Sequence, residues 1–480
     1  MRQWLTGTTA LALGCAAPAV AQSTSPIDTL EPAATETIAP PAPTGDPVVD
    51  RLNALEANLQ RLEAKNRELE DELELSRGRI ASVEVRAAKG VQPGVSPTLA
   101  DTNGVFSFKS RGVIDVDYAH FGTRAGGYDF NDGTGFRRAR LGFEGSAFKD
   151  FLWRIEVDFA GNVVTLQDAY LSYAGYKNTV LTLGQFKAPF GLESNNSDNY
   201  NTFIERGMFT NAFGTAGAER RIGAQAAYQR DNFTVAAGFF GDNESIGRST
   251  GAPLTNAPDE SIGVNARATW EPLNQPGRIV HIGAAGFWRS RLKSGDVGRA
   301  LRLTERPNIR VDNGNIIDTG VIPGVDNLYY AGAEATLVHG PFSVTGEFGR
   351  LYVDRLPGLP DTHFDGGYVY GSWFVTGETR AFRTGNFDRI RPLSPFSNKG
   401  GTGAVELAVR YDTLDVGSTP VAARLGTRAS SLTAGLNWYL TPNFKLQFNY
   451  IRFEGDNTPL DPVGAKTKGD AVATRLHLDW

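Results

Sequence analysis

The sequence predicts an all-β protein, a 16-stranded antiparallel transmembrane β-barrel preceded by a short N-terminal coiled-coil helix. Three observations lead to this prediction. The first residues have the pattern of an export signal. From about residue 104 onward, apolar and polar residues alternate with a period of two. The connections between the alternating segments are short and long in turn, which is typical of outer-membrane barrels.

The composition narrows the alternatives. The 480 residues include 55 glycines and 10% aromatic residues, and the hydrophobic fraction is an ordinary 41%. After the N-terminus no run of 18 apolar residues occurs, which disfavours a helical membrane protein. The formal net charge of −5 does not indicate which ions a barrel would pass, because local charges set the selectivity of a pore.

Residues 1–21 are interpreted as a signal peptide. Arg2 supplies the positive start, an apolar run follows, and Ala19-Val20-Ala21 fits the small-residue cleavage pattern. A lipoprotein signal around Cys15 is the weaker alternative, because Ala12 occupies the position three before it. Cys15 is the only cysteine. The cleaved chain would therefore have no disulfide, no cysteine-ligated metal and no cysteine nucleophile.

A helix with a narrow apolar seam is predicted over residues 48–88, between a Pro/Ala/Thr-rich linker at 22–47 and a second linker at 89–103. The seam positions are spaced alternately three and four residues apart: Leu52, Leu55, Leu59, Leu62, Asn66, Leu69 and Leu73. Such a seam is typical of coiled coils, and one helix alone cannot bury it. Self-association is therefore favoured over a single amphipathic helix lying on the barrel.

Residues 104–480 form the predicted barrel domain. In Trp153–Phe159, for example, apolar residues occupy one face, and Arg154, Glu156 and Asp158 occupy the other. A soluble sandwich would show the same alternation, but the export signal, the aromatic residues near strand ends and the connection lengths favour a membrane barrel. One connection, 379–402, is long and basic although it falls on the short-turn side. The predicted strands are 104–120, 135–148, 151–160, 166–175, 179–188, 218–229, 232–241, 260–271, 278–289, 327–339, 341–353, 366–378, 403–412, 430–440, 443–454 and 471–480.

Several motifs in this domain resemble one known family. They are Phe136–Gly145, Gln167–Leu171, Gly184–Glu193, Thr202–Arg206, Glu219–Gly223, Phe374–Arg380 and Ala404–Tyr411. Residues 104–480 are similar to the phosphate-selective porin O and P family of Gram-negative outer membranes. The resemblance implies a usually trimeric 16-stranded barrel, a long third loop folded inside it, and preference for anions such as phosphate or pyrophosphate. It also implies a coiled coil ahead of the barrel in part of the family.

Candidate anion-binding residues are the Arg and Lys side chains expected to face the lumen. Arginine suits phosphate because its planar fork donates two hydrogen bonds to two oxygens. The candidates are Arg138, Arg140, Lys187, Arg206, Arg221 and, if the connection 379–402 folds inward, Arg383 and Arg391. Arg137 is expected to face outward. The alternative is that the candidates only brace the wall by pairing with Glu144, Glu193, Glu205 and Glu219.

Other function classes are less well supported. The five histidines lie in no catalytic or metal-binding motif. The protein is therefore not expected to be an enzyme or to bind a cofactor or a metal. A structural barrel whose coiled coil contacts peptidoglycan and a general non-selective porin remain alternatives. The expected protein is exported through the periplasm to the outer membrane. Its expected partners are membrane lipid, two further copies of itself and small anionic solutes, without nucleic acid.

Overall fold

A computed structural model describes residues 105–480 except 126–128, 244–258, 295–296, 384, 421–425 and 457–465. It also describes residues 96 and 98–101 and scattered positions from 46 to 66. The predicted signal peptide, the first linker almost entirely and most of the predicted helix lie outside the described residues. The described positions from 48 to 66 are helical. Within the second predicted linker, a three-residue strand, β1 (Thr98–Ala100), pairs with the start of the barrel.

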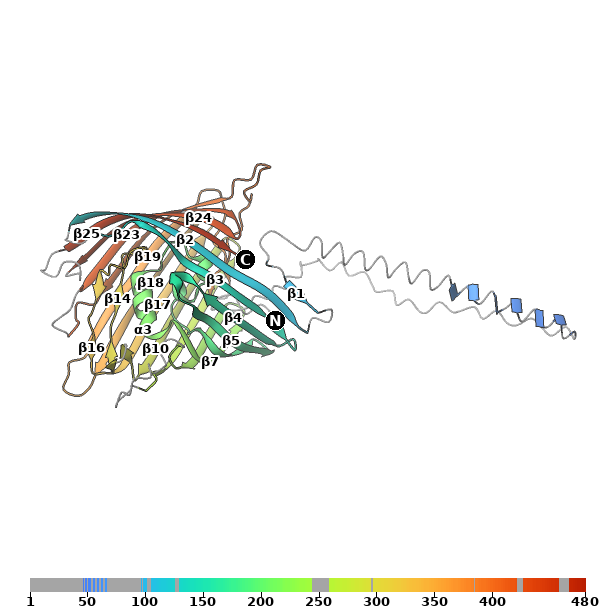
Figure 1. Ribbon diagram of the computed structural model, residues 1–480, viewed down its shortest axis with the longest axis horizontal. Helices are drawn as coiled ribbons and strands as arrows, with labels where there is room; N and C mark the ends of the chain where they lie inside the picture. The colour runs from blue at the N-terminus through green and yellow to red at the C-terminus, as the bar shows by residue number, and fades with distance from the viewer. Residues whose placement is uncertain are drawn as a thin grey trace. The chain divides into compact units, whose positions relative to one another are not determined.

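Sixteen antiparallel strands close into a barrel, because β2 pairs with both β3 and the last strand, β25 (Figure 1). The strands are β2 (Ser107–Ala125), β3 (Gly133–Ala147), β4 (Phe151–Asp158), β5 (Thr165–Tyr176), β6 (Thr179–Lys187), β7 (Arg220–Arg230), β8 (Phe233–Phe240), β9 (Ile262–Gln275), β10 (Arg278–Ser290), β17 (Val325–His339), β18 (Phe342–Arg355), β19 (Thr362–Phe374), β22 (Ala404–Asp415), β23 (Arg428–Thr441), β24 (Phe444–Asp456) and β25 (Lys466–Asp479). Every predicted strand is present, and each end lies within five residues of its prediction.

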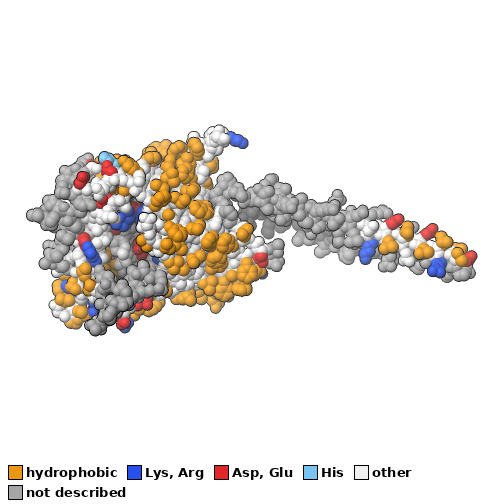
Figure 2. All heavy atoms as spheres, in the orientation of Figure 1, with side chains coloured by type: hydrophobic (Ala, Val, Ile, Leu, Met, Phe, Trp, Pro, Cys, Tyr) orange, Lys and Arg blue, Asp and Glu red, His pale blue; other side chains and the backbone are white. Residues whose placement is uncertain are grey.

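Alternation determines which side chains face the lumen. In β22, Leu407, Val409 and Tyr411 are 40–53% exposed on the outer wall, whereas Glu406 and Arg410 are fully buried inside. Figure 2 shows the resulting cover of hydrophobic side chains over the visible outer wall of the barrel. An apolar exterior around a charged interior is the arrangement of a membrane barrel and excludes a soluble sandwich. Among the described residues, no helix is long and apolar enough to cross a membrane.

The third long connection, residues 188–219, folds into the lumen as the family resemblance implied. It contains α2 (Leu192–Asn195), η2 (Asp198–Tyr200) and α3 (Met208–Gly217). Its phenylalanines pack against tyrosines of the wall at ring-centroid distances of 5.5–6.2 Å, in the pairs Phe203–Tyr370, Phe209–Tyr368 and Phe213–Tyr330. This lumen loop therefore has a hydrophobic core of its own with one side of the barrel.

Two further connections narrow the lumen. In residues 291–324, the Asn308 side chain donates to the Arg206 carbonyl of the lumen loop. This connection contains the short strands β11 (Lys293–Ser294), β12 (Val297–Gly298), β13 (Ala300–Leu301), β14 (Thr304–Glu305), β15 (Ile317–Asp318) and β16 (Ile322–Pro323). On the short-turn side, residues 375–403 include a hairpin of β20 (Phe382–Arg383) and β21 (Asn386–Phe387) that enters the lumen. Its Phe387 amide donates to Asn196 Oδ1 of the lumen loop at 2.9 Å. A short 3₁₀ turn, η1 (Ala160–Asn162), joins β4 to β5.

Candidate functional site

Four of the seven candidate cations meet at one carboxylate, Asp198 of the lumen loop. The distances to its oxygens are 3.2 Å from Arg138 Nε, 2.8 Å from Arg140 Nη1 and 3.7 Å from Lys187 Nζ, and Arg206 Nη2 makes a close ion pair. Burial alone would raise the pKa of Asp198, but these cations hold the pKa well below its usual range. Asp198 stays ionised and ties β3 and β6 to the lumen loop.

The second acidic centre of the lumen loop is Glu205. Its carboxylate accepts from Arg137 Nε at 2.6 Å, Arg475 Nη2 at 3.1 Å and Arg310 Nε at 3.3 Å. Although burial favours the neutral acid, the three guanidinium groups lower the pKa of Glu205 well below its usual range. Strands β3 and β25 and the connection 291–324 thus converge on this residue.

The outward orientation expected for Arg137 is wrong. Asp115 of β2 pairs with Arg138, and Val116 pairs with Phe136, so Arg137 is the extra residue of a β-bulge. A bulge interrupts strict alternation and redirects the side chain. Arg137 and Arg138 therefore both face inward.

Three of the bracing partners considered from the sequence form ion pairs with other cations. Glu144 pairs with Arg154, Glu193 with Arg410, and Glu205 with Arg137. Glu144 also pairs with Lys109 and Arg111. Four of the candidates brace the lumen loop through Asp198. No sequence period singles out this residue, because it lies in a loop rather than on a strand face.

Cations follow β2 and β3 along the barrel wall. The register places Lys109 beside Glu144, Arg140 beside Val113, and Arg138 beside Asp115. Six residues of strand separate the Lys109 and Asp115 levels, which corresponds to about 20 Å. The middle of this ladder, Arg138 and Arg140, is buried under the lumen loop, with side-chain exposures of 3% and 8%.

The two ends of the ladder are open to water. We call Lys109 and Arg111 the short-turn cluster, and Arg137, Arg206 and Arg310 the loop-side cluster. Arg220, the first residue of β7 after the lumen loop, belongs to neither and shares Glu156 with Arg111. In each ion pair the cation is more exposed than the acid. The side-chain exposures are 30% and 6% for Lys109–Glu144, 18% and 2% for Arg111–Glu156, 16% and 1% for Arg220–Asp168, 26% and 2% for Arg137–Glu205, 14% and 4% for Arg206–Asp198, and 26% and 3% for Arg310–Glu305. Both clusters therefore present positive charge to the lumen and keep the compensating carboxylates behind it.

The remaining candidates lie elsewhere. Arg221 is buried, pairs with Asp242 at 3.1 Å and donates to the Ala216 carbonyl at the end of α3, so it anchors a helix end. Arg383 is half-buried on the inward hairpin, as predicted for a connection that enters the lumen. Arg391 follows Ile390, which is buried inside the rim, and its side chain is exposed. The connection thus does not carry Arg391 into the lumen interior with Arg383.

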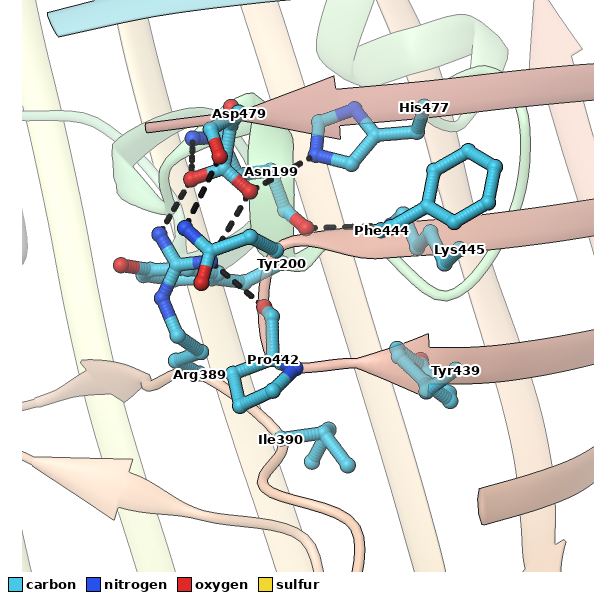
Figure 3. Close-up of a pocket in the computed structure, with 11 residues that line it drawn as sticks. Asn199, Tyr200, Arg389, Ile390, Tyr439, Pro442, Phe444, Lys445, His477 and Asp479 are labelled. Atoms are coloured by element: carbon cyan, nitrogen blue, oxygen red, sulfur yellow. Dashed lines mark hydrogen bonds and ion pairs between the residues drawn. The ribbon is translucent and has the colours of Figure 1, made fainter. Parts of the chain in front are cut away.

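A small cleft lies where the lumen loop, the connection 375–403 and the turn before β24 meet. Its empty volume is about 280 Å³. Figure 3 shows Arg389 and Asn199 converging on the Asp479 carboxylate, with Arg389 Nη1 and Asp479 Oδ1 2.8 Å apart. Lys445 Nζ donates to the Asn199 carbonyl at 3.0 Å. The charged side chains of this cleft are satisfied by one another or by main chain, so they hold three segments together. The described residues include no cluster suited to a metal ion.

Comparison with known proteins agrees with this architecture. Residues 108–480 match the family described as phosphate-selective porin O and P. A Caulobacter vibrioides protein described as uncharacterized is 30% identical over 417 residues, covering 83% of this chain and 82% of the relative. Porin O of Pseudomonas aeruginosa is 28% identical over 417 residues, covering 79% of this chain and 90% of that protein.

Solved structures of similar fold include an anion-selective porin from Comamonas acidovorans, at 14% identity and a TM-score of 0.49, covering 78% of this chain and all of that one (100%). The outer-membrane channel DcaP of Acinetobacter baumannii has 13% identity and a TM-score of 0.47, covering 80% and 99%. The family match over most of the chain, together with the barrel, identifies the protein class. The chain belongs to the phosphate-selective porin O and P family and is a porin of the Gram-negative outer membrane.

Proposed function

We propose that this porin passes small anions by passive diffusion and prefers oxyanions such as phosphate. The observation that carries the proposal is the unequal exposure within the lumen ion pairs, where the cation faces water and the acid is covered. A solute in the lumen meets the guanidinium or ammonium group first. Positive charge near the path replaces part of the hydration of an anion and repels cations. The activity needs neither catalysis nor a cofactor.

Arginine supplies four of the five cations in the two clusters, which supports oxyanions over halides. A guanidinium group donates parallel hydrogen bonds to two oxygens of one phosphate. Arg137 and Arg310 both pair with Glu205 and are each 26% exposed, so neither is fully occupied by that carboxylate. These two side chains and Arg206 form the proposed oxyanion-binding position on the long-loop side. Lys109 and Arg111 form the corresponding position on the short-turn side.

The test is a reversal-potential measurement on purified protein in a planar bilayer across a KCl gradient. A potential shifted toward the chloride equilibrium value, with the chloride current reduced when phosphate is added, supports the proposal. A potential shifted toward the potassium value would refute anion preference. A matched control is the variant Lys149→Gln/Lys177→Gln, which removes two cations from exposed short turns outside the lumen and should behave as wild type.

We also propose a homotrimer in which residues 48–88 form a coiled coil, following a cleaved signal peptide at 1–21 and the linker 22–47, and followed by the linker 89–103. In a single chain the seam residues Leu52, Leu55, Leu59 and Leu62 are 56–68% exposed, and exposed leucines of this spacing call for partner helices. Light scattering on detergent-solubilised protein gives the number of copies. The variant Leu55→Asp/Leu62→Asp should weaken association; unchanged association would assign it to the barrel wall alone.

A further inference from the structure

The connection between β19 and β22, residues 375–403, crosses the rim of the barrel. Its first half is inside: Ile390 is buried against Phe374, Ala404 and Tyr439. Phe374 and Tyr439 belong to the inward faces of β19 and β23, where the Tyr439 hydroxyl donates to lumen-facing Glu406. The hairpin 382–387 then places this half against the lumen loop.

The second half, residues 391–403, returns on the outer wall, and we call it the rim loop. Phe396 packs edge-on against Trp438 at 5.7 Å between ring centroids. Trp438 shares the outward face of β23 with Leu432 and Leu436. Trp438 Nε1 also donates to the Thr402 carbonyl at 2.8 Å. The rim loop therefore contacts the lipid-facing wall and not the lumen.

The rim loop is a tightly built turn. The Phe396 amide donates to the Leu440 carbonyl at 2.7 Å, and the Gly403 amide donates to the Ser394 carbonyl at 2.8 Å. Gly400 has a φ of +107°, and a Cβ at Gly401 would lie 1.7 Å from the Pro395 carbonyl oxygen. These glycines permit a close turn that larger residues would disrupt. The side chains that the turn exposes are thus held out by a defined backbone.

Two of these exposed side chains are large and apolar. Leu393 is 74% exposed, although the adjacent Leu393 amide is fixed by Glu378 Oε1 at 2.9 Å. Phe396 is 49% exposed despite its contact with Trp438. Nearby on the same rim, Trp373 stacks on Phe342 at 5.9 Å, and both are exposed on the outward face. The rim loop extends the aromatic girdle that marks the membrane–water interface of a barrel.

The charges of the rim loop have one sign. Residues 391–403 contain Arg391 and Lys399 and no acidic residue. Both side chains are exposed, and neither forms an ion pair within the described part of the chain. Short turns face the periplasm in membrane barrels, so this cationic, apolar turn lies at the level of the periplasmic leaflet. Cations beside an interfacial apolar segment attract anionic lipid headgroups.

We propose that the rim loop is a lipid-binding anchor. Leu393 and Phe396 enter the boundary between headgroups and acyl chains of the periplasmic leaflet, and Arg391 and Lys399 bind the phosphates of anionic phospholipids. Because the same connection continues into the lumen, the anchor ties the hairpin 382–387 to the membrane surface. This inference rests on the outer-membrane location and not on the ion preference of the porin.

The depth of Leu393 tests the apolar part of the proposal. The variant Leu393→Cys carries one thiol once the signal peptide with Cys15 is cleaved; it is labelled with an environment-sensitive fluorophore and placed in lipid nanodiscs. Reference variants are Trp373→Cys in the girdle and Leu359→Cys, an exposed position in the connection between β18 and β19 at the opposite rim. Quenching by spin-labelled phospholipid should match position 373. Quenching no stronger than at position 359 overturns the proposal. Protection from both lipid and aqueous quenchers would mean that a neighbouring copy covers the loop, which also overturns it.

The charged part has its own measurement. Native mass spectrometry compares phosphatidylglycerol with phosphatidylcholine retained by wild type, by Arg391→Gln/Lys399→Gln, and by Lys149→Gln/Lys177→Gln, which loses the same charge from other turns of that rim. Retention of phosphatidylglycerol should fall about fivefold for each cation removed from the rim loop. An equal fall in the control variant, or no fall in the rim-loop variant, would contradict headgroup binding at this loop.

Discussion

The lumen has two unlike walls. The wall of β2 to β7 carries the cation ladder with water-facing clusters at its ends, whereas the wall of β9 to β19 carries paired hydroxyls such as Thr336–Thr345 at 3.1 Å and Ser343–Ser372 at 2.8 Å. An ion pair does occur there, Arg267–Glu334, but its side chains are only 5% and 2% exposed. Both walls follow the same inward alternation. The helix α3 and the hairpin 382–387 pack on the wall of β9 to β19, whereas the ends of the cation ladder on the other wall stay exposed. Coverage as well as sequence pattern therefore decides which charges act on a solute.

The largest effect should come from Asp198→Asn, which removes the carboxylate shared by four cations. Breaking a buried ionic network by deleting one partner costs about 3–5 kcal/mol of the free energy of unfolding. Thr336→Val on the opposite wall removes one buried hydroxyl pair and should cost about 1 kcal/mol. The free energies of unfolding of both variants are measured by denaturant unfolding, followed by gel mobility. Equal losses would mean that the cation wall does not depend on Asp198 for its stability.

The pH dependence of the same site has a definite sign. The folded pKa of Asp198 lies below the ordinary value of 3.8, so its stabilising contribution is present above that value. The contribution should be lost as the pH falls below about 3.8 toward the folded pKa. Asp198→Asn should therefore flatten the acid limb of the stability profile. An acid limb identical to that of wild type would contradict this assignment.

A smaller effect is expected on ion selectivity from Lys109→Gln/Arg111→Gln. One charge at 4 Å in water contributes about 1 kcal/mol, so each cation removed should lower the ratio of anion to cation permeability about fivefold or less. Reversal potentials give the ratio directly. The turn variant Lys149→Gln/Lys177→Gln is the control; if both variants shift the ratio equally, overall charge rather than the exposed cluster sets the preference.

The rim-crossing connection offers a paired comparison of two arginines. Arg383→Ala shortens a side chain on the inward hairpin and should raise single-channel conductance modestly. Arg391→Ala changes an exposed residue beyond the rim and should leave conductance unchanged. Single-channel recordings of the two variants measure both conductances. An effect of Arg391→Ala as large as that of Arg383→Ala would place both side chains at the ion path.

The smallest effect concerns Glu305 beside the loop-side cluster. Burial raises the pKa of Glu305 to about 7, although Arg310 opposes the shift. Glu305 is therefore neutral below this pH and negative above it, and anion preference should weaken by about twofold or less as the pH rises from 6 to 8. Stability gained from the raised pKa is present below the ordinary value of 4.5 and is lost as the pH rises through about 7. Glu305→Gln should abolish the selectivity step; a step that persists in this variant arises from another group.

The strands were predictable because a two-residue period extends over ten or more residues in most of them, as in β22 and β24. The same rule placed Arg138 and Arg140 inward correctly. It failed at Arg137, because a bulge adds one residue without a sequence signal that the period reveals. The position of Asp198 and the inward course of residues 291–324 and 375–390 depend on contacts between segments far apart in the chain. The alternation of apolar and polar residues along a strand carries no information on such contacts.

Besides the ion pairs at Asp198 and Glu205, the wall holds the lumen loop by its main chain. Lys187 donates to the Ser194 and Asn196 carbonyls, Lys445 to the Asn199 and Asn201 carbonyls, and Arg410 to the Glu205 carbonyl. Every residue has a main-chain carbonyl, whatever its side chain. Mutations of lumen-loop side chains other than Asp198 and Glu205 can therefore leave the loop in place. The chemistry of the passage can thus be changed one residue at a time while the path of the loop is kept.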